Sequence, residues 1–251
     1  MPQSPCNKVA SLVRGRGVAG ACAHVLEVIR HDLDEWLEER RSLAEEAEFD
    51  RRRGVHTSDR IDPKTLSVIG SHRDSAVRYQ PISEGSFRTL LARLIDLVGA
   101  GLPLYSFIDM GCGMGKVLLL AAEYPFRQVI GVEFAPDLVA ICEKNLREDR
   151  AASQRRCHTV TVALADAADF SFPRCPLVVF LYNPFGPEVL APLLNNLCCA
   201  ERSGTHEDFV VYHNAQHAQL LLEAGFTSVW ENQGDRILKR FAGSSTDYFS
   251  A

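Results

Sequence analysis

The sequence predicts an α/β fold: a doubly wound, mostly parallel seven-stranded sheet that ends in an antiparallel hairpin and follows an N-terminal helical extension. Three observations predict it. From residue 104 onward, short apolar runs alternate with amphipathic segments of helix length, which is typical of a parallel sheet covered by helices on both faces. Three closely spaced glycines follow the first apolar run. Only a short turn at 232–235 separates the last two runs, which must therefore pair antiparallel.

The alternation defines the elements of this domain, 104–251, in order. Strands are predicted at 104–109, 128–134, 159–166, 176–182, 209–213, 226–230 and 236–241. Helices are predicted at 116–124, 135–147, 187–200 and 215–224. Each predicted strand is short and apolar, and each predicted helix gathers its apolar residues on one face.

Two segments precede this domain, 1–60 and 61–103. The first is predicted to be a helical extension, because apolar residues recur at helical spacing ahead of a charged stretch, at Leu26, Ile29, Leu33, Trp36 and Leu37. Such a helix cannot bury its apolar face alone. We expect it to pack either on the main domain or on a second copy of the chain, as a homodimer. The lead-in segment contains a predicted helix at 83–98, which we expect to cover the ligand site.

Composition and charge narrow the function classes. The chain has 251 residues, 46% of them hydrophobic, and a formal net charge of -5. Domains that hold nucleic acid through its backbone are usually basic, so nucleic acid is not the expected partner. The run of three arginines at 51–53 is interpreted as a solvated helix end. No apolar run is long enough for a membrane span and the N-terminus lacks a signal-peptide pattern, so we expect a cytoplasmic protein.

The cysteine pattern argues against a metal site. The chain has eight cysteines, but none forms a C-x-x-C pair, and no Cys/His group has the spacing of a zinc site. Scattered cysteines of this kind indicate free thiols in a reducing compartment. We therefore expect no structural metal.

The glycine turn after the first strand allows three interpretations. The dinucleotide fingerprint G-x-G-x-x-G fails, because its third glycine would fall on Lys116 or Leu118. A phosphate-binding P-loop fails as well, because its first glycine would be Met110 and its hydroxyl residue would be Val117. The third interpretation is an acidic residue followed by G-x-G-x-G, and residues 109–115 match it in full.

This match, Asp-Met-Gly-Cys-Gly-Met-Gly at 109–115, resembles the cofactor turn of class I, Rossmann-like methyltransferases, which use S-adenosylmethionine. The resemblance covers about residues 77–242. It implies that the Asp109 carboxylate faces the cofactor's ammonium group. It also implies that Gly111, Gly113 and Gly115 let the methionine part lie against the backbone.

Further acidic residues stand where this resemblance places them. Glu133 ends the second strand, where an acid accepts the two ribose hydroxyls, and its neighbour Phe134 belongs to the same predicted site. Asp166 ends the third strand, where an acid receives the adenine amino group and the N–H of Ala167 meets a ring nitrogen. Each acid could instead cap a helix or a turn. Their joint position at the carboxyl ends of parallel strands favours a ligand site.

The segment Asn183-Pro184-Phe185 ends the fourth strand and resembles the [DN]-P-P-[FYW] signature of amino-group methyltransferases, with one proline missing. The resemblance implies that Asn183 and Pro184 orient an acceptor amine and that Phe185 covers the substrate. Asn183 would also touch the cofactor. The alternative is that Asn183 caps the next helix. The segment, with Tyr79-x-Pro81 upstream, also resembles non-SET lysine methyltransferases; Tyr79 would cover the cofactor or pack on the core.

These residues lead to a ranked set of functions. The first is N-methylation of an amino group on a protein, a peptide or a small molecule, with S-adenosylhomocysteine as the product. The second is O-methylation of a small molecule, for which His213, after the fifth strand, is the candidate base. The third is non-catalytic binding of S-adenosylmethionine by an accessory protein. A nicotinamide-dependent oxidoreductase is the remaining alternative.

Overall fold

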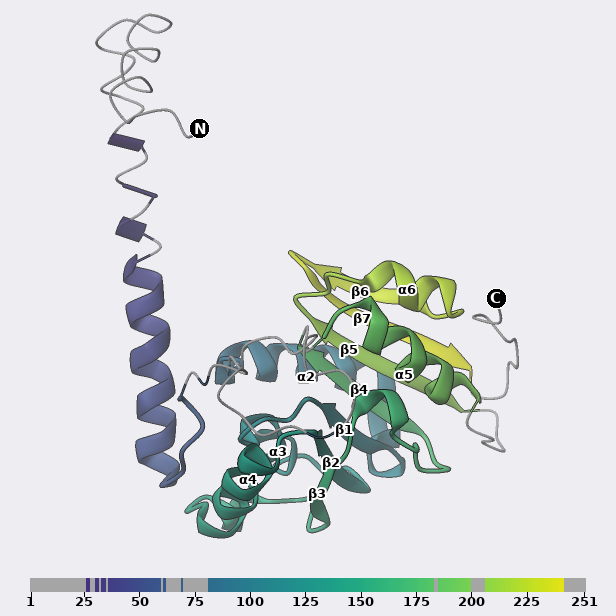
Figure 1. Cartoon of the computed structure of the whole chain (residues 1–251), viewed down its shortest axis with the longest axis horizontal. Coiled ribbons are helices and arrows are strands. Elements are labelled where there is room, and N and C mark those ends of the chain that lie inside the picture. The colour runs from purple at the N-terminus through teal and green to yellow at the C-terminus, as the bar shows by residue number, and fades with distance from the viewer. Residues whose placement is uncertain are drawn as a thin grey trace, which may run out of the picture. The chain divides into compact units, whose positions relative to one another are not determined.

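The computed structural model describes residues 26–27, 30–31, 33–34, 36–59, 61, 69, 81–182, 185–199 and 206–241. The chain forms two compact units, 1–47 and 48–251. In the first unit, all the described residues are helical (Figure 1). Its large apolar side chains are exposed, among them Leu33, Trp36 and Leu43. The guanidinium of Arg40 lies 4.8 Å from the centre of the Trp36 ring, which is a cation–π distance.

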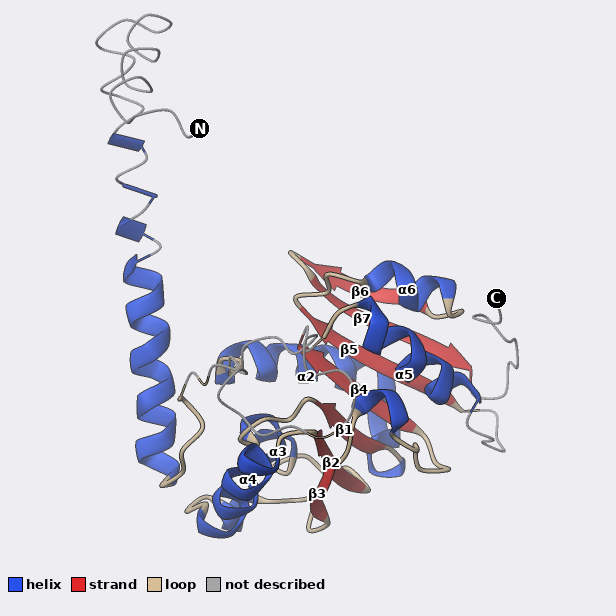
Figure 2. Cartoon of the chain, in the orientation of Figure 1, coloured by secondary structure: helices blue, strands red, loops and turns tan. Residues whose placement is uncertain are grey.

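The second unit is built on one seven-stranded sheet with the order β3-β2-β1-β4-β5-β7-β6 (Figures 1 and 2). The strands are β1 (Ser106–Met110), β2 (Gln128–Glu133), β3 (Val160–Leu164), β4 (Leu177–Tyr182), β5 (Glu207–His213), β6 (Thr227–Asn232) and β7 (Asp235–Phe241). The first five run parallel, and β7 runs antiparallel to both β5 and β6. The predicted mostly parallel sheet with a terminal antiparallel hairpin is confirmed.

The hairpin does not simply extend the sheet in chain order. β7 inserts between β5 and β6, so that Tyr212 of β5 pairs with Arg236 of β7. The two-residue turn of Gln233 and Gly234, both with positive φ, joins β6 to β7. Residues of this kind suit the tight turns of hairpins. The insertion brings the start of β7 to the carboxyl end of β5.

Helices cover both faces of the sheet (Figure 2). They are α2 (Glu84–Val98), α3 (Lys116–Ala121), α4 (Pro136–Glu148), α5 (Pro187–Cys199) and α6 (Ala218–Glu223). Residues of α2, α3 and α4 share one buried cluster with one face of the strands, and residues of α5 and α6 share a second cluster with the opposite face. The short 3-10 helix η5 (Ala167–Asp169) follows β3.

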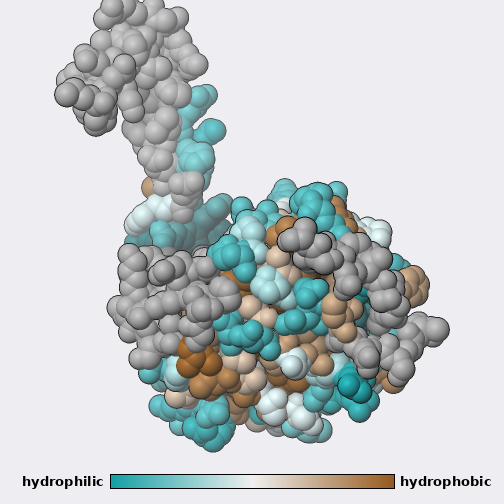
Figure 3. Space-filling model, turned by 45° about the vertical axis from the view of Figure 1, so that its right-hand side comes forward, coloured by the Kyte–Doolittle hydropathy of each residue, from teal (hydrophilic) through white to brown (hydrophobic). Residues whose placement is uncertain are grey.

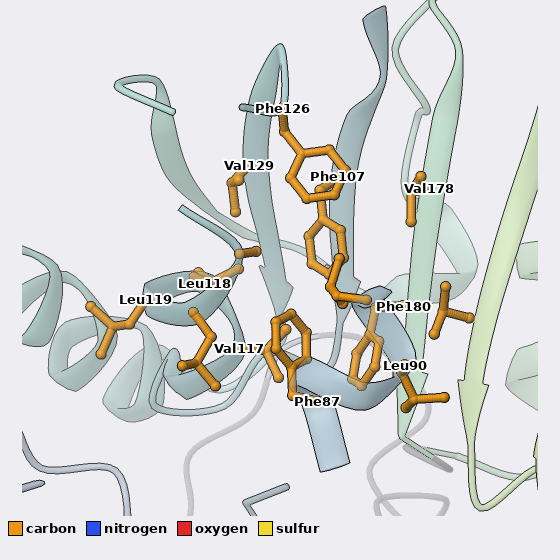
Figure 4. Packing of buried hydrophobic residues seen from close by; sticks show 14 of the residues in the cluster. Phe87, Leu90, Phe107, Val117, Leu118, Leu119, Phe126, Val129, Val178 and Phe180 are labelled. Carbon is orange, nitrogen blue, oxygen red and sulfur yellow. The ribbon is translucent and has the colours of Figure 1, made fainter. Parts of the chain in front are cut away.

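An aromatic cluster fixes α2 on the sheet (Figure 4). The ring of Phe87 on α2 meets Phe107 of β1 and Phe180 of β4 edge to face, at centroid distances of 6.1 and 5.6 Å. Phe126 packs on Phe107 at 5.1 Å. Each such pair adds about 0.5–1.5 kcal/mol beyond its buried area. The cluster therefore holds β1 in place immediately before the glycine turn.

Residues 48–59 dock on the main domain at the start of the second unit. Arg53 is 2% exposed and donates to both carboxylate oxygens of Asp149, at 2.9 and 2.8 Å, and to Glu123 at 2.6 Å. The interpretation of residues 51–53 as a solvated helix end is therefore wrong for Arg53. It holds for Arg51, which is exposed and pairs with Glu48. Periodicity alone does not reveal an ion pair between residues 96 positions apart.

The surface of the molecule is mixed in character. On the face seen in Figure 3, hydrophobic residues gather in small patches between hydrophilic ones. Such scattered apolar residues are normal for a globular domain. Among the described residues, no helix is long and apolar enough to cross a membrane.

Candidate active site

The glycine turn joins β1 to α3 at the carboxyl edge of the sheet. Gly111, Gly113 and Gly115 all have positive φ, at 77°, 51° and 86°, a region that side chains with a Cβ rarely adopt. The backbone N–H groups of Gly111 and Cys112 both donate to the carbonyl of Val132 on β2, at 2.9 and 3.0 Å. All three predicted glycines therefore shape one turn that folds onto β2.

Packing beneath the turn adds a second reason for glycine at position 115. A Cβ placed there would collide with the thiol of Cys142 on α4. The Cys112 thiol lies beside Cys142, and both are buried. Hydrogen bonding to Cys142, followed by burial, raises the pKa of Cys112 well above its usual range. These thiols pack as small apolar groups and are not poised as nucleophiles.

Asp109 lies next to the end of β1 with only 3% of its surface exposed. Its carboxyl group makes no side-chain hydrogen bond to another described residue. Burial, and then repulsion by Glu133, raise its pKa well above the ordinary aspartate range. A buried carboxyl group without such a partner is costly unless a ligand supplies one. The ammonium group of an amino-acid moiety would satisfy this requirement.

Glu133 ends β2 and faces the glycine turn. One carboxylate oxygen accepts the N–H of Gly113 at 2.9 Å, and the other accepts the N–H groups of Phe134 and Ala135 at 3.0 Å each. Burial raises the pKa of Glu133, while these hydrogen bonds lower it in part. The capping role foreseen as its alternative is therefore present. It is compatible with ligand binding, because each carboxylate oxygen has two lone pairs.

Asp166 and Ala167 follow β3 at the same edge. The Asp166 side chain accepts the N–H of Ala168 at 3.0 Å and caps η5. The side chain of Asn196 on α5 donates to the carbonyl of Ala168 at 2.6 Å and ties this loop to the opposite layer. The structure therefore brings Asp109, Glu133 and Asp166 to the ends of three neighbouring strands, in the order β1, β2, β3.

Asn145 is a site-shaping residue that the sequence did not reveal. Its amide nitrogen donates to the carbonyls of Met114 in the glycine turn and of His56, at 2.9 and 2.7 Å. Its oxygen accepts the N–H of His56 at 2.9 Å. Asn145 is buried on α4. It therefore links the docked segment 48–59 to the glycine turn.

The end of β4 is described only in part. Tyr79, Asn183 and Pro184 lie outside the described residues, and their roles stay predictions. Phe185 is described and is mostly buried in the core cluster that contains Val189 and Leu190 of α5. Its predicted contact with a substrate likewise stays a prediction.

A second group at this edge combines β4, β5 and β7. His213 ends β5 beside Tyr182, the last residue of β4, and their rings meet at a centroid distance of 4.5 Å. The Nδ1 atom of His213 lies 2.7 Å from a carboxylate oxygen of Asp235 at the start of β7. The sequence indicated His213, but Asp235 appeared there only as a turn residue, because its position depends on the insertion of β7.

The residues at the turn suit S-adenosylmethionine. Its ammonium group fits the buried Asp109 carboxyl, its ribose hydroxyls fit an acceptor such as Glu133, and its close approach to backbone fits the left-handed glycines. Among the described residues, no group of three or more His, Cys, Asp or Glu side chains could hold a metal ion.

The fold and the glycine turn define the class I methyltransferase architecture. Residues 107–198 match the family model described as a methyltransferase domain. The chain thus carries a class I methyltransferase domain, the class that uses S-adenosylmethionine. A curated relative, nocamycin O-methyltransferase from Saccharothrix syringae, is 38% identical over 89 residues, which are 35% of this chain and 29% of the relative. The match thus spans under a third of that relative's length.

Two solved structures are similar at low sequence identity. Magnesium protoporphyrin IX methyltransferase from Synechocystis, with bound S-adenosylmethionine, has a TM-score of 0.45 and 17% identity, over 62% of this chain and 78% of that chain. A 16S rRNA methyltransferase from T. thermophilus, in complex with AdoMet and guanosine, has a TM-score of 0.47 and 21% identity, over 64% of this chain and 43% of that chain.

Proposed function

We propose that this protein is a methyltransferase that binds S-adenosylmethionine at the glycine turn and transfers its methyl group. The observation that carries the proposal is the meeting of three acids, Asp109, Glu133 and Asp166, at neighbouring strand ends around a left-handed glycine turn. Open α/β sheets bind their ligands at this edge. When bound, S-adenosylmethionine supplies an electrophilic methyl group.

Each residue of the chain has a defined task in this proposal. Asp109 holds the ammonium group, and the glycines of the turn admit the methionine part to the backbone. Glu133 binds the ribose, and Asp166 with Ala167 binds the adenine. Tyr79 and Phe134 cover the cofactor. Most of the rate enhancement then comes from alignment of the acceptor with the methyl group.

For the acceptor, we propose an amino group on a protein, a peptide or a small molecule. The segment Asn183-Pro184-Phe185 supports this choice, since an amide oxygen and a carbonyl can accept the two hydrogens of an amine. O-methylation of a small molecule is the second candidate, favoured by the relative named as an O-methyltransferase. The net charge of -5 argues against a nucleic-acid acceptor.

Transfer of a labelled methyl group from S-adenosylmethionine to fractionated cell lysate tests this function. We expect label in a protein, peptide or metabolite fraction, and chemical analysis of the product separates N-methyl from O-methyl groups. Label confined to nucleic acid would contradict the proposed acceptor. Cofactor binding without transfer to any fraction would favour the non-catalytic alternative.

We also propose a homodimer formed through the first unit and a cytoplasmic location. The described apolar side chains of the first unit are exposed, and a helix of this kind needs a partner surface. The six cysteines among the described residues are free, which fits a reducing compartment. Replacing Leu33 and Trp36 with glutamate should convert a dimer into a monomer in light scattering, whereas a wild-type monomer would contradict the dimer.

A further inference from the structure

We infer that His213 is the general base of the methyl transfer and that Asp235 is its positioning residue, so that the acceptor atom carries a proton when it binds. This inference rests on the proposed function and deepens it. It specifies an acceptor of the hydroxyl or ammonium class, rather than a thiolate, a thioether or an unprotonated ring nitrogen, none of which needs a base.

The position of His213 in the sheet supports this role. β1, which leads into the glycine turn, is flanked by β2 on one side and by β4 on the other. The cofactor acids Glu133 and Asp166 follow β2 and β3, whereas His213 ends β5, beyond β4. With about 4.8 Å between neighbouring strands, His213 lies about 10 Å across the sheet from the end of β1. It therefore stands on the side of the turn that the cofactor acids leave free.

The contact with Asp235 fixes the tautomer of the imidazole. An ionised carboxylate only accepts hydrogen bonds, so the Nδ1 atom, 2.7 Å from the Asp235 oxygen, carries the proton. In neutral His213 the lone pair then lies on Nε2, which makes no hydrogen bond to another described residue. The side chain keeps 19% of its surface exposed. A fixed tautomer with a free Nε2 is what a base requires.

Three elements hold the pair in this orientation. The ring of Tyr182 on β4 packs against the imidazole at an interplanar angle of 60°. The same Asp235 oxygen also accepts the N–H of Asn214 at 3.0 Å, and Asn214 adopts a positive φ of 52°. The neighbouring charges, Arg236 and Glu231, pair with each other at 3.4 Å. The carboxylate is therefore held by the backbone and remains aimed at Nδ1.

The proposed step is balanced in atoms and electrons. The lone pair of the acceptor oxygen or nitrogen forms the new bond to the methyl carbon, and the carbon–sulfur bond breaks with its electron pair remaining on sulfur. The acceptor's proton passes to Nε2 of His213. The resulting imidazolium is stabilised by the charge of Asp235 at Nδ1.

The chain contains a matched control at the opposite end of the same strand. His206 lies 3.9 Å from Asp208, a carboxylate that accepts the N–H of Leu177. This pair lies at the amino end of β5, away from the glycine turn. Changing His206 therefore perturbs a histidine beside an acid without touching the proposed acceptor side.

Nitrogen-15 NMR of the full chain, labelled on histidine, tests the tautomer without any acceptor. We expect the neutral His213 ring, assigned by its loss in His213→Gln, to carry its proton on Nδ1. In Asp235→Asn the proton should shift towards Nε2, because an amide can donate to Nδ1. A wild-type His213 protonated on Nε2 would overturn the inference.

Transfer of a labelled methyl group to the lysate fraction that accepts it provides the second test. His213→Gln should slow transfer by a factor of about 10²–10⁴, as expected for loss of a general base, with S-adenosylmethionine affinity unchanged. Asp235→Asn should also slow it, and His206→Gln should leave it unchanged. Transfer by His213→Gln at the wild-type rate would overturn the inference. Loss of S-adenosylmethionine binding by the wild-type protein would instead refute the proposed function.

Discussion

The carboxylate of Glu133 accepts the backbone N–H of Gly113 at 2.9 Å, so the end of β2 is tied directly to the glycine turn. The same carboxylate accepts two N–H groups at the start of α4. One side chain therefore sets the relative position of the turn and of the next helix. It does so at the point where we place the ribose of the cofactor.

Glu133→Gln should weaken S-adenosylmethionine binding by about 1.5–3 kcal/mol, the contribution of hydrogen bonds to a charged group. The amide retains the shape of the side chain but loses the charge and one acceptor atom. Isothermal titration calorimetry measures the change. Glu143→Gln, an exposed position on α4, serves as the control and should bind normally. Unchanged affinity in Glu133→Gln would show that the ribose is held elsewhere.

Asp109→Asn should stabilise the free protein and weaken cofactor binding. Because burial and the nearby Glu133 raise the pKa of Asp109 in the folded state, the folded protein retains a proton that the unfolded chain releases. Stability is therefore lost as the pH rises through the folded pKa. Asparagine removes this loss, so Tm at about pH 8 should rise.

The same substitution removes the counter-charge for the ammonium group. S-adenosylmethionine affinity should fall by about 1.5–3 kcal/mol. In the wild-type protein, affinity should strengthen as the pH rises through the pKa of Asp109. A variant with lower Tm and normal affinity would contradict both the buried titration and the proposed contact.

Gly115→Ala should destabilise the domain by about 2–5 kcal/mol, combining about 1–2 kcal/mol of left-handed strain with about 1–3 kcal/mol of overpacking. The new methyl group would meet the Cys142 thiol. The double variant with Cys142→Ala should recover the overpacking part alone. Gly85→Ala on α2, with open space around it, is the control and should be neutral or stabilising. Urea unfolding measures all three, and a Gly115→Ala variant as stable as wild type would contradict the structure of the turn.

Arg53→Met should destabilise the second unit by about 3–5 kcal/mol, because it leaves Asp149 buried without its main partner. Arg51→Met is the matched control and should change stability by less than about 0.5 kcal/mol, since that residue is exposed. Chemical denaturation compares them, and equal effects would contradict the docking of residues 48–59.

The same ion pair gives the fold a dependence on acid. Burial alone would raise the pKa of Asp149, but the hydrogen bonds and charge of Arg53 outweigh it and lower the pKa. The stability that Arg53 contributes is therefore present above the unfolded pKa and is lost as the pH falls through the folded pKa. The difference in stability between wild type and Arg53→Met should shrink in acid, and a constant difference would contradict this origin.

Asn183→Ala should lower the rate of methyl transfer much more than cofactor affinity, because the side chain acts on the acceptor. Single-turnover transfer and calorimetry separate the two quantities. Equal losses in both would indicate that Asn183 is a structural cap of α5.

The elements that sequence predicts well are those that local pattern determines. The seven strands, the glycine turn and the three acids at strand ends follow from alternation and spacing, and the sheet contains them where predicted. The burial of Arg53, the bridge made by Asn145 and the pairing of His213 with Asp235 join residues 96, 89 and 22 positions apart. They depend on which surfaces meet in three dimensions, and a single sequence carries no periodic signal for such contacts.

Calorimetric titration of the full chain with S-adenosylmethionine tests the central claim most directly. We predict saturable binding of one molecule per chain, competed by S-adenosylhomocysteine and abolished or strongly weakened in a variant that combines Asp109→Asn with Glu133→Gln. Tight binding of NAD with no binding of S-adenosylmethionine would contradict the account.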